Sequence, residues 1–433
     1  MKTKLINLAH GGKVLYSPRK EKKGISFIFH FNAGSINDPV GKNGLAHFAE
    51  HAIFSFRTKN RTRDEKMELL QDLPINGSTS LFNVLFYASC VKQELKNCIE
   101  FFIDSFTNLI FTKEDFKKEQ PIILDEIKTR KKTNKKEDAY NTLPKMLVGK
   151  HSHAYKISSA GNEQTFKKIT LKDLKFFIKN YFTLNNLVLT ICGNVSKKQL
   201  KEIISEVEKL PVSNISGLNR YELGDVKKPF FNYTQAVEKK QDLITIRYKL
   251  SPHENLKSSA KQIYLNLLGQ SFKKEVFNFF RTQKNYCYSA SSWVQIVSNT
   301  SFLNISIPTQ SENTSKILND FPEFLASLKK ENLKKDVDNE KQSMINTTNF
   351  DYIPVDFFAT KVTNYFTKYS EIFDDTTENL VEKIIDSIQF EKIYSSIKNT
   401  LKTKPYLSLV ANDEKFKDFD YKNFCKKLKI NLE

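Results

Sequence analysis

The chain has 433 residues, of which 39% are hydrophobic, so it can bury large cores and is not a small disulfide-stapled scaffold. At about 150 residues per domain, this length predicts two or three domains. Lys and Arg number 68 against 49 Asp and Glu, which gives a net charge of +19, but 35 Phe and 17 Tyr exclude a mainly disordered chain.

The sequence gives no signal for export or membrane insertion. Its basic N-terminal stretch is interrupted by glycines and Pro18 and lacks the apolar run of a signal peptide. It also lacks an apolar stretch of about 18 residues, which a spanning helix needs. The five cysteines are scattered and odd in number, so they form neither a disulfide ladder nor a CxxC metal site. We therefore expect a cytoplasmic protein without a transmembrane segment.

The positive charge is spread along the whole chain. Its densest run, KTRKKTNKK at residues 128–136, follows a helical pattern and ends in acidic residues. Zinc-finger, RNP and glycine-loop signatures do not accompany it. A solvated helix face is therefore the main interpretation, with attraction of acidic peptides as the alternative. We expect no nucleic-acid partner.

In the first half of the chain, long predicted helices alternate with short strands. Gly24 to Ala33 runs apolar, as a buried strand does, and a turn-rich stretch follows it. Pro74 ends one helix, and Ser196 stands at the N-cap position of another. The predicted elements are a strand at 24–33, helices from 45 and at 63–73, a strand at 80–91, helices at 91–110, 113–130 and 169–180, a strand at 187–192 and a helix at 197–210.

The second half repeats this order after a stretch rich in Ser, Asn, Gly and Pro. The late segment YLSLVANDEKF parallels LVLTICGNVSKKQ at 187–199. Together these similarities predict an internal duplication, with domains at 1–212 and 229–433 joined by a linker at 213–228. The predicted elements here are a strand at 242–250, a helix at 259–268 and a strand at 406–411.

Residues 47–51 read His-Phe-Ala-Glu-His, an HxxEH motif inside a predicted helix. On a helix, positions i and i+4 share a face, so His47 and His51 can reach one metal ion while Glu50 projects beside it. Two neutral imidazoles that hold Zn²⁺, and an adjacent carboxylate that takes a proton from water, suit zinc-dependent hydrolysis. The other histidines have no partner at this spacing, so we interpret them as structural.

A catalytic zinc site needs a third protein ligand. The predicted helix at 113–130 contains Glu119 and Glu126, which lie seven residues apart and so on one face. The residues alone do not decide between them. A solvated or salt-bridged carboxylate is the alternative interpretation for both.

The run NAGSINDPVGKNGLAHFAEHAIF at 32–54 resembles the pitrilysin/insulinase family of inverted-motif zinc peptidases, in its half-length branch that includes mitochondrial processing peptidase and bacterial relatives. The resemblance implies one Zn²⁺ per chain, with Glu126 as the third ligand and Glu119 as a nearby carboxylate that orients the site. It also implies that Glu50 is the general base.

Two further segments resemble functional parts of the same family. Asn76, Gly77, Ser78 and Thr79 resemble a strand edge that pairs with the substrate backbone, although the family often has Ala where Gly77 stands. An ordinary turn is the alternative interpretation of this segment.

The run LGQSFKKEVFNFFRTQKNYCYSASSW at 268–293 resembles the stretch that supplies an Arg and a Tyr to the active site. Arg281 would close a helix and bind a substrate carbonyl. Tyr288 would begin a strand, and its hydroxyl would stabilise the oxyanion. Apart from the family, both would be interpreted as structural.

The fold that the resemblance implies is α+β, with two homologous domains that each hold a mostly antiparallel sheet backed by helices and together form half of a clamshell chamber. It implies a dimer, either a homodimer or a heterodimer with a paralogous subunit. The expected function is a zinc metalloendopeptidase for unfolded peptides of limited size. A leader- or signal-peptide processing enzyme is one form of it, and a catalytically silent scaffold or partner subunit is the alternative.

Overall fold

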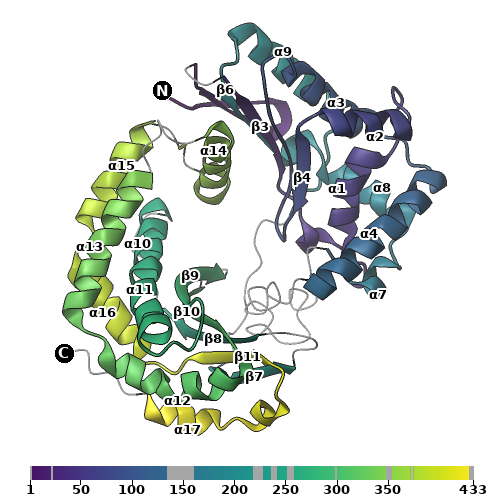
Figure 1. Ribbon diagram of the computed structural model, residues 1–433. Coiled ribbons are helices and arrows are strands. Elements are labelled where there is room, and N and C mark those ends of the chain that lie inside the picture. Colours follow the sequence, from purple (N-terminus) through teal and green to yellow (C-terminus); the bar gives the residue numbers. More distant parts are fainter. Residues whose placement is uncertain are drawn as a thin grey trace. The chain divides into compact units, whose positions relative to one another are not determined.

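The computed structural model describes residues 2–20, 23–133, 160–217, 228–235, 241–250, 258–297, 300–347, 354–370, 372–373 and 375–428. The chain forms two compact units (Figure 1). Unit 1 comprises residues 1–135, 149–221 and 350–377, and unit 2 comprises residues 136–148, 222–349 and 378–433. None of the described helices is long and apolar enough to cross a membrane.

Unit 1 contains a six-stranded sheet in the order β1-β2-β6-β3-β5-β4. Only the β2–β6 pair is parallel, and the other neighbours are antiparallel. The strands are β1 (Lys4–Asn7), β2 (Lys13–Pro18), β3 (Ile25–Phe31), β4 (Ile75–Thr79), β5 (Val84–Cys90) and β6 (Leu187–Gly193).

The helices of unit 1 pack an aromatic core against this sheet. Phe29 of β3 contacts Phe102 and Phe106, which come from α3, with ring centroids 5.7 and 5.4 Å apart. The helices are α1 (Leu45–Ser55), α2 (Arg63–Asp72), α3 (Leu95–Asn108), α4 (Lys113–Thr133), α7 (Glu163–Phe166), α8 (Leu171–Tyr181) and α9 (Lys197–Val207), and the short 3₁₀ turns are η1 (Ala9–Gly11), η2 (Ser35–Asn37) and η3 (Leu184–Asn186).

Helix α14 (Val355–Tyr369) covers the opposite face of the same sheet, although it comes from late in the chain (Figure 1). Its Phe358 and Val362 form an apolar cluster with Ile28 of β3 and Val188 of β6. Strand β3 is therefore buried on both faces, which explains why five of its seven residues are apolar. The domain bounds expected from the sequence stay a prediction, but the contacts group residues 350–377 with unit 1 and not with the second half.

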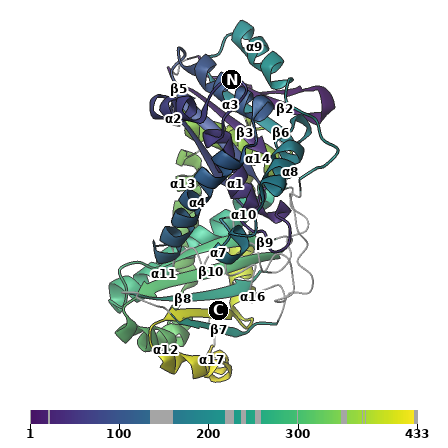
Figure 2. The same ribbon diagram turned by 90° about the vertical axis from the view of Figure 1, so that its right-hand side faces the viewer.

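Unit 2 contains a five-stranded sheet in the order β7-β11-β8-β10-β9, whose strands lie side by side in Figure 2. Its strands are β7 (Phe231–Gln235), β8 (Asp242–Lys249), β9 (Ser291–Val297), β10 (Thr300–Thr309) and β11 (Tyr406–Ala411). Its helical elements are α10 (Ser258–Ser271), α11 (Lys273–Phe277), the π-helical segment η4 (Asn278–Gln283), α12 (Ser311–Ser327), α13 (Lys330–Thr347), α15 (Asp375–Ser387), α16 (Phe390–Leu401), the 3₁₀ turn η6 (Glu414–Asp418) and α17 (Tyr421–Lys427).

The two sheets repeat one topology. Without β1, the first sheet has the order β2-β6-β3-β5-β4, and the second has the order β7-β11-β8-β10-β9, which match strand for strand in chain order. In each sheet one pair is parallel, β2 with β6 and β7 with β11. The expected α+β fold of two related units with mostly antiparallel sheets is confirmed. Helices α1 and α2 fall between β3 and β4, where unit 2 has α10, α11 and η4.

Some sequence predictions fall outside the described residues. Of the linker at 213–228, residues 218–227 are not described. The basic run at 128–136 begins in α4, which extends to residue 133, and its last residues are not described.

Candidate active site

Helix α1, which carries the HxxEH motif, has its first turn fixed by a buried carboxylate. Asp38 accepts hydrogen bonds from the backbone N–H groups of Gly44, Leu45 and Ala46 at 2.7, 3.2 and 2.9 Å. These N–H groups have no partner within a helix, so the contact satisfies them and sets where the helix begins. Gly44 has φ of 101°, a left-handed conformation that favours glycine.

The C-terminal end of α1 is held by a buried lysine from α2. The Lys66 ammonium donates to the carbonyl of Ile53 at 2.6 Å and to the Ser105 hydroxyl at 2.8 Å. Carbonyls in the last turn of a helix lack an intrahelical partner and attract a cation. Burial lowers the pKa of Lys66 to about 7. Both ends of the motif helix are therefore fixed by side chains from outside it.

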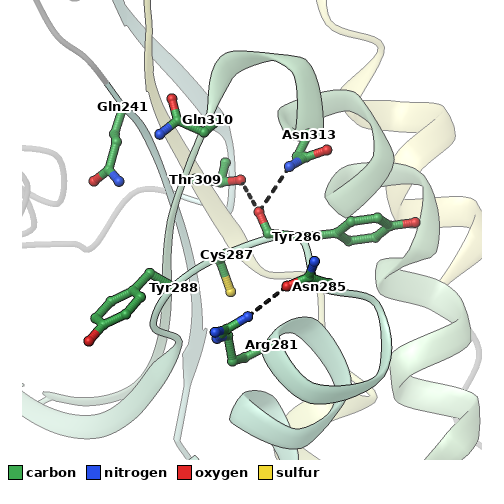
Figure 3. Close-up of a pocket in the computed structure, with 9 residues that line it drawn as sticks. All are labelled: Gln241, Arg281, Asn285, Tyr286, Cys287, Tyr288, Thr309, Gln310 and Asn313. Atoms are coloured by element: carbon green, nitrogen blue, oxygen red, sulfur yellow. Dashed lines mark hydrogen bonds between the residues drawn. The ribbon is translucent and has the colours of Figure 1, made fainter.

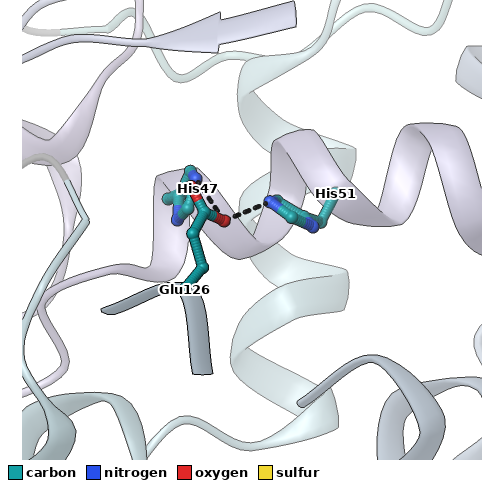
Figure 4. Close-up of side chains that lie close together, drawn as sticks. All are labelled: His47, His51 and Glu126. Carbon is teal, nitrogen blue, oxygen red and sulfur yellow. Dashed lines mark ion pairs between the residues drawn. The ribbon is translucent and has the colours of Figure 1, made fainter. Parts of the chain in front are cut away.

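Three potential metal ligands converge in unit 1 (Figure 4). His47 and His51 extend from α1, and Glu126 extends from α4. The Glu126 carboxylate lies 3.7 Å from His47 Nε2 and 3.3 Å from His51 Nε2, and the ligand atoms all lie within 4.8 Å of one another. Tetrahedral bonds of about 2.1 Å place ligand atoms about 3.4 Å apart. These three residues therefore fit a zinc ion.

Glu119 lies beside His51 and is not one of the three potential metal ligands. Its carboxylate is 3.0 Å from His51 Nδ1 and accepts a hydrogen bond from the Arg63 guanidinium at 2.6 Å. With Nδ1 donating to Glu119, His51 presents Nε2 toward Glu126. The structure thus places Glu126 beside both imidazoles and places Glu119 where it orients one of them.

The acidic residues around His51 favour a positive charge at this site. Burial lowers the pKa of His51, but hydrogen bonds with Glu119 and Glu126 and the charge of Glu50 outweigh it and raise the pKa to about 9. Acidic groups that hold a proton on an imidazole also attract a divalent cation that replaces the proton. The chemistry of the donor set therefore agrees with its geometry.

Glu50 is buried, with 8% of its surface exposed, and contacts strand β4. Its carboxylate accepts a hydrogen bond from the Thr79 hydroxyl at 2.6 Å. A Cβ atom on Gly77 would lie 3.0 Å from Glu50 Oε1 and 2.8 Å from the Phe54 ring, so this position leaves room only for glycine unless a neighbour moves. In the segment predicted to bind substrate, Thr79 therefore contacts the predicted base, and Gly77 lies beside it.

Residues 75–79 form a strand and not a turn, and among the described residues β4 pairs with β5 only, at the end of the sheet. The N–H of Gly77 bonds to the side-chain oxygen of Asn76 at 2.7 Å and not to β5. Since both backbone groups of a residue in an antiparallel strand point to the same side, the Gly77 carbonyl also faces the open edge. Asn76 and Ser78 are exposed. This edge can accept an extended peptide.

Arg281 and Tyr288 lie together in unit 2 (Figure 3). Arg281 is part of η4, and its guanidinium carbon is 5.8 Å from the centroid of the Tyr288 ring. The expectation that Tyr288 begins a strand is wrong, because β9 starts at Ser291 and Tyr288 lies in the preceding bend. Pairing with β10 begins only at Ser291, which lies opposite Ser306, and the Tyr288 side chain is 83% exposed.

Sequence reasoning missed several residues that shape these sites. Arg63 and Lys66 lie on α2, and no motif singles them out, because their partners are far away in the sequence. Asp38 precedes α1 by several residues, so it does not stand at the usual N-cap position. Only the fold brings these groups to the motif helix.

Family models match two parts of this chain. Residues 13–162 match the model described as insulinase (peptidase family M16). Residues 168–344 match the model described as peptidase M16 inactive domain. His47, Glu50, His51 and Glu126 all fall in the first match.

Individual relatives and solved structures agree with these matches. The chain is 23% identical over 349 residues to the uncharacterized zinc protease YmxG of Bacillus subtilis, a match that covers 77% of this chain and 81% of that protein. It is 27% identical over 245 residues to the mitochondrial-processing peptidase subunit beta of Neurospora crassa, which covers 53% of this chain and 48% of that protein. The periplasmic protease PqqL of Escherichia coli has a similar fold, with a TM-score of 0.82 at 17% identity over 100% of this chain and 50% of that chain.

Proposed function

Because this chain belongs to the insulinase family of peptidases, we propose that it is a zinc-dependent endopeptidase that cleaves unfolded peptides of limited size. The observation that carries the proposal is the convergence of His47, His51 and Glu126 at the separations of a tetrahedral zinc site. Relatives of the chain that are named zinc proteases support it.

In this proposal His47, His51 and Glu126 hold the metal. A bound Zn²⁺ supplies Lewis acidity, which lowers the pKa of a water molecule and polarises a carbonyl. Glu50 accepts a proton from the attacking water and later donates it to the leaving amine. The hydrogen bond from Thr79 fixes the orientation of the Glu50 carboxylate for both transfers.

The substrate would bind as an added strand. Its backbone would pair with the open edge of β4 at Gly77, next to Glu50. Arg281 would bind a substrate carbonyl, and the Tyr288 hydroxyl would stabilise the oxyanion. Main-chain pairing makes modest demands on side chains, so we expect a broad range of peptide sequences to bind.

The assembly and setting are part of the same proposal. We propose a dimer, either of two identical chains or with a paralogous subunit, in which each chain forms half of a clamshell chamber and Arg281 and Tyr288 serve the zinc site of the other chain. The cytoplasm is the proposed location. Removal of a leader or signal peptide is a narrower form of the proposal, supported by the similarity to a mitochondrial-processing peptidase subunit.

A catalytically silent scaffold or partner subunit is the second candidate. It is favoured by one observation, the match of residues 168–344 to a domain model described as inactive. That match contains Arg281 and Tyr288 but none of the potential metal ligands, which lie in the other match. The first candidate therefore accounts for more of the site.

The test uses Glu50→Gln, which removes the base and keeps a side chain of the same size. We expect the purified wild-type chain to hold close to one zinc ion, to cleave unstructured peptides and to lose this activity with a chelator. The variant should keep its zinc and lose cleavage. Glu68→Gln changes an exposed carboxylate on α2 and is the matched control. A wild-type chain with neither zinc nor activity would favour the scaffold, and wild-type rates in Glu50→Gln would overturn the assignment of the base.

A further inference from the structure

Two hollows flank Arg281 in unit 2. The first, of about 220 Å³, is the one in Figure 3. The second, of about 420 Å³, is lined by Phe277, Arg281, Thr282 and Asn285. Arg281 and Asn285 line both hollows. The Arg281–Asn285 pair therefore stands between the two hollows as a shared part of their lining.

Asn285 has an unusual backbone conformation and a direct contact with Arg281. Its φ is 52°, in the left-handed region that asparagine tolerates better than most residues. Its side-chain oxygen accepts a hydrogen bond of 2.6 Å from Arg281 Nη1 (Figure 3). The left-handed turn reverses the chain at the end of η4, so that the Asn285 side chain lies back toward Arg281.

The backbone on both sides of Asn285 is fixed. The N–H groups of Lys284 and Tyr286 donate to the carbonyls of Phe279 and Phe280 at 3.0 and 2.9 Å. The Tyr286 carbonyl accepts hydrogen bonds from the Thr309 hydroxyl at 2.6 Å and from the Asn313 amide at 3.2 Å. These four hydrogen bonds hold the turn in place.

Exposed contacts between two side chains are usually weak, because both must lose conformational freedom. In this pair Asn285 has a short side chain on a fixed backbone, so most of the conformational freedom that is lost is that of the Arg281 side chain. A guanidinium has five N–H donors, and the bond to Asn285 uses one of them. The remaining donors keep a defined direction and are available to a ligand.

We propose that Asn285 is a positioning residue that holds the Arg281 guanidinium in the orientation that binds a substrate carbonyl. This inference rests on the proposed function, since it assumes that Arg281 contacts a bound peptide. Asn285 itself does not need to touch the peptide. Its effect is on peptide affinity, because a free Arg281 must be ordered at the moment of binding.

A purely structural role is the competing explanation, in which Asn285 is present only because the turn needs a left-handed residue. Asn285→Gly separates the two, since glycine adopts the same φ without strain and removes the side-chain oxygen. Asn285→Asp keeps an oxygen acceptor at the same place and also tolerates the left-handed conformation. His10 has φ of 55° in unit 1, so His10→Gly makes the same backbone change away from this pair.

The experiment measures the affinity of an unstructured peptide in the Glu50→Gln background, where the peptide is not cleaved, together with kcat and KM in the wild-type background. We expect Asn285→Gly to weaken binding and raise KM about tenfold with kcat nearly unchanged, because the ordering of a free Arg281 side chain then opposes binding of the peptide in the ground state and the transition state alike. Asn285→Asp should restore affinity, and His10→Gly should leave it unchanged. If the chain with Asn285 and the Asn285→Gly variant bound the peptide with equal affinity, the proposal would be overturned.

A double-mutant comparison adds a readout that a structural role would not give. If Asn285 acts through Arg281, adding Asn285→Gly to Arg281→Ala should not weaken binding further. An undiminished effect in the Arg281→Ala background would overturn the proposal. Failure of the proposed function has a different signature, namely a wild-type chain that binds the peptide without cleaving it. A wild-type chain that does not bind peptides would overturn the role of Asn285 as well.

Discussion

At the scale of single residues, Glu119 contacts one of the three potential metal ligands without being one of them. It lies between Arg63 and His51 and accepts a hydrogen bond from each. Burial alone would raise the pKa of Glu119, but the bonds from His51 and Arg63 outweigh it and keep the pKa below its ordinary value. A carboxylate that stays ionised fixes the ring of His51 and raises its basicity as a ligand.

This contact predicts the effect of Glu119→Gln. The amide keeps the shape but loses the charge, so His51 should be held less well and zinc should bind about 10-fold to 100-fold more weakly. The measurement is competition with a chelator of known affinity. Glu114→Gln is the control, because Glu114 lies on the same helix and forms an exposed ion pair with Arg57. Equal zinc affinity in the two variants would contradict this role.

The sequence predicted the residues whose partners are near in the chain. His47, Glu50 and His51 follow from helical spacing within one turn of α1. The residues alone left Glu119 and Glu126 undecided, because spacing places both on one face of α4 and says nothing of what that face contacts. No feature of the sequence indicated a role for Arg63, since its hydrogen bond to Glu119 forms only when α2 packs against the site.

At the scale of elements, Lys66 connects α2 to the end of the motif helix. Burial lowers its pKa to about 7, against the charge of Asp104, which raises it. The unfolded chain keeps the proton up to the ordinary pKa of 10.5, so between pH 7 and 10.5 the unfolded state binds more protons than the folded state. The contribution of Lys66 to stability therefore rises with pH, by at most about 1.4 kcal/mol per pH unit.

Lys66→Met should remove this dependence. The difference in unfolding free energy between the wild type and the variant should grow from pH 7 toward pH 10, which urea unfolding at several pH values can measure. Lys96→Met on α3 is the control, because the Lys96 side chain is exposed and its ion pair with Glu100 lies at the surface. A constant difference across this range would show that the Lys66 ammonium does not titrate there.

The elements themselves were largely predictable, and their exceptions have physical causes. Pro121 lies inside α4, yet the helix continues because Ile123 and Ile127 are buried in the core and outweigh the lost hydrogen bond. The strand expected at 80–91 begins only at residue 84, since residues 80–83 form the turn that leads from β4 into β5.

At the scale of the whole molecule, unit 1 depends on a helix from the distant part of the chain. Phe358 of α14 is 1% exposed, and Arg19 lies over its ring at 4.5 Å. The Thr363 hydroxyl donates to that of Thr190 in β6 at 2.7 Å. Without α14, the apolar face formed by Ile28 and its neighbours would be open to water.

Phe358→Ala should therefore destabilise unit 1 by about 3–5 kcal/mol, the usual cost of removing a buried aromatic ring. Hydrogen exchange at the amides of β3 and β6 should speed up with it. Phe357→Ala is a matched control on the same helix, because Phe357 is 65% exposed. Similar losses of stability in both variants would mean that α14 is not part of the core of unit 1.

The duplicated order of strands could be inferred from similar segments, but the position of α14 could not. Apolar periodicity indicates that one face of a helix is buried, and it does not identify the sheet that buries it. For that reason the sequence predicts two domains that are each continuous in the chain, separated by a linker at 213–228. The contacts instead group residues 350–377 with unit 1.

The hydrogen bond within β4 also bears on self-association. An open strand at the end of a sheet is a template on which copies of a protein aggregate. Here Asn76 already occupies the N–H of Gly77, and the strand is short, with polar side chains at Asn76 and Ser78. A second copy of the chain that paired with this edge would first have to break the hydrogen bond between the Gly77 N–H and the Asn76 side chain. In the proposed function, a substrate peptide would break the same bond but would also bind beside Glu50, so this edge would disfavour aggregation and still accept a substrate.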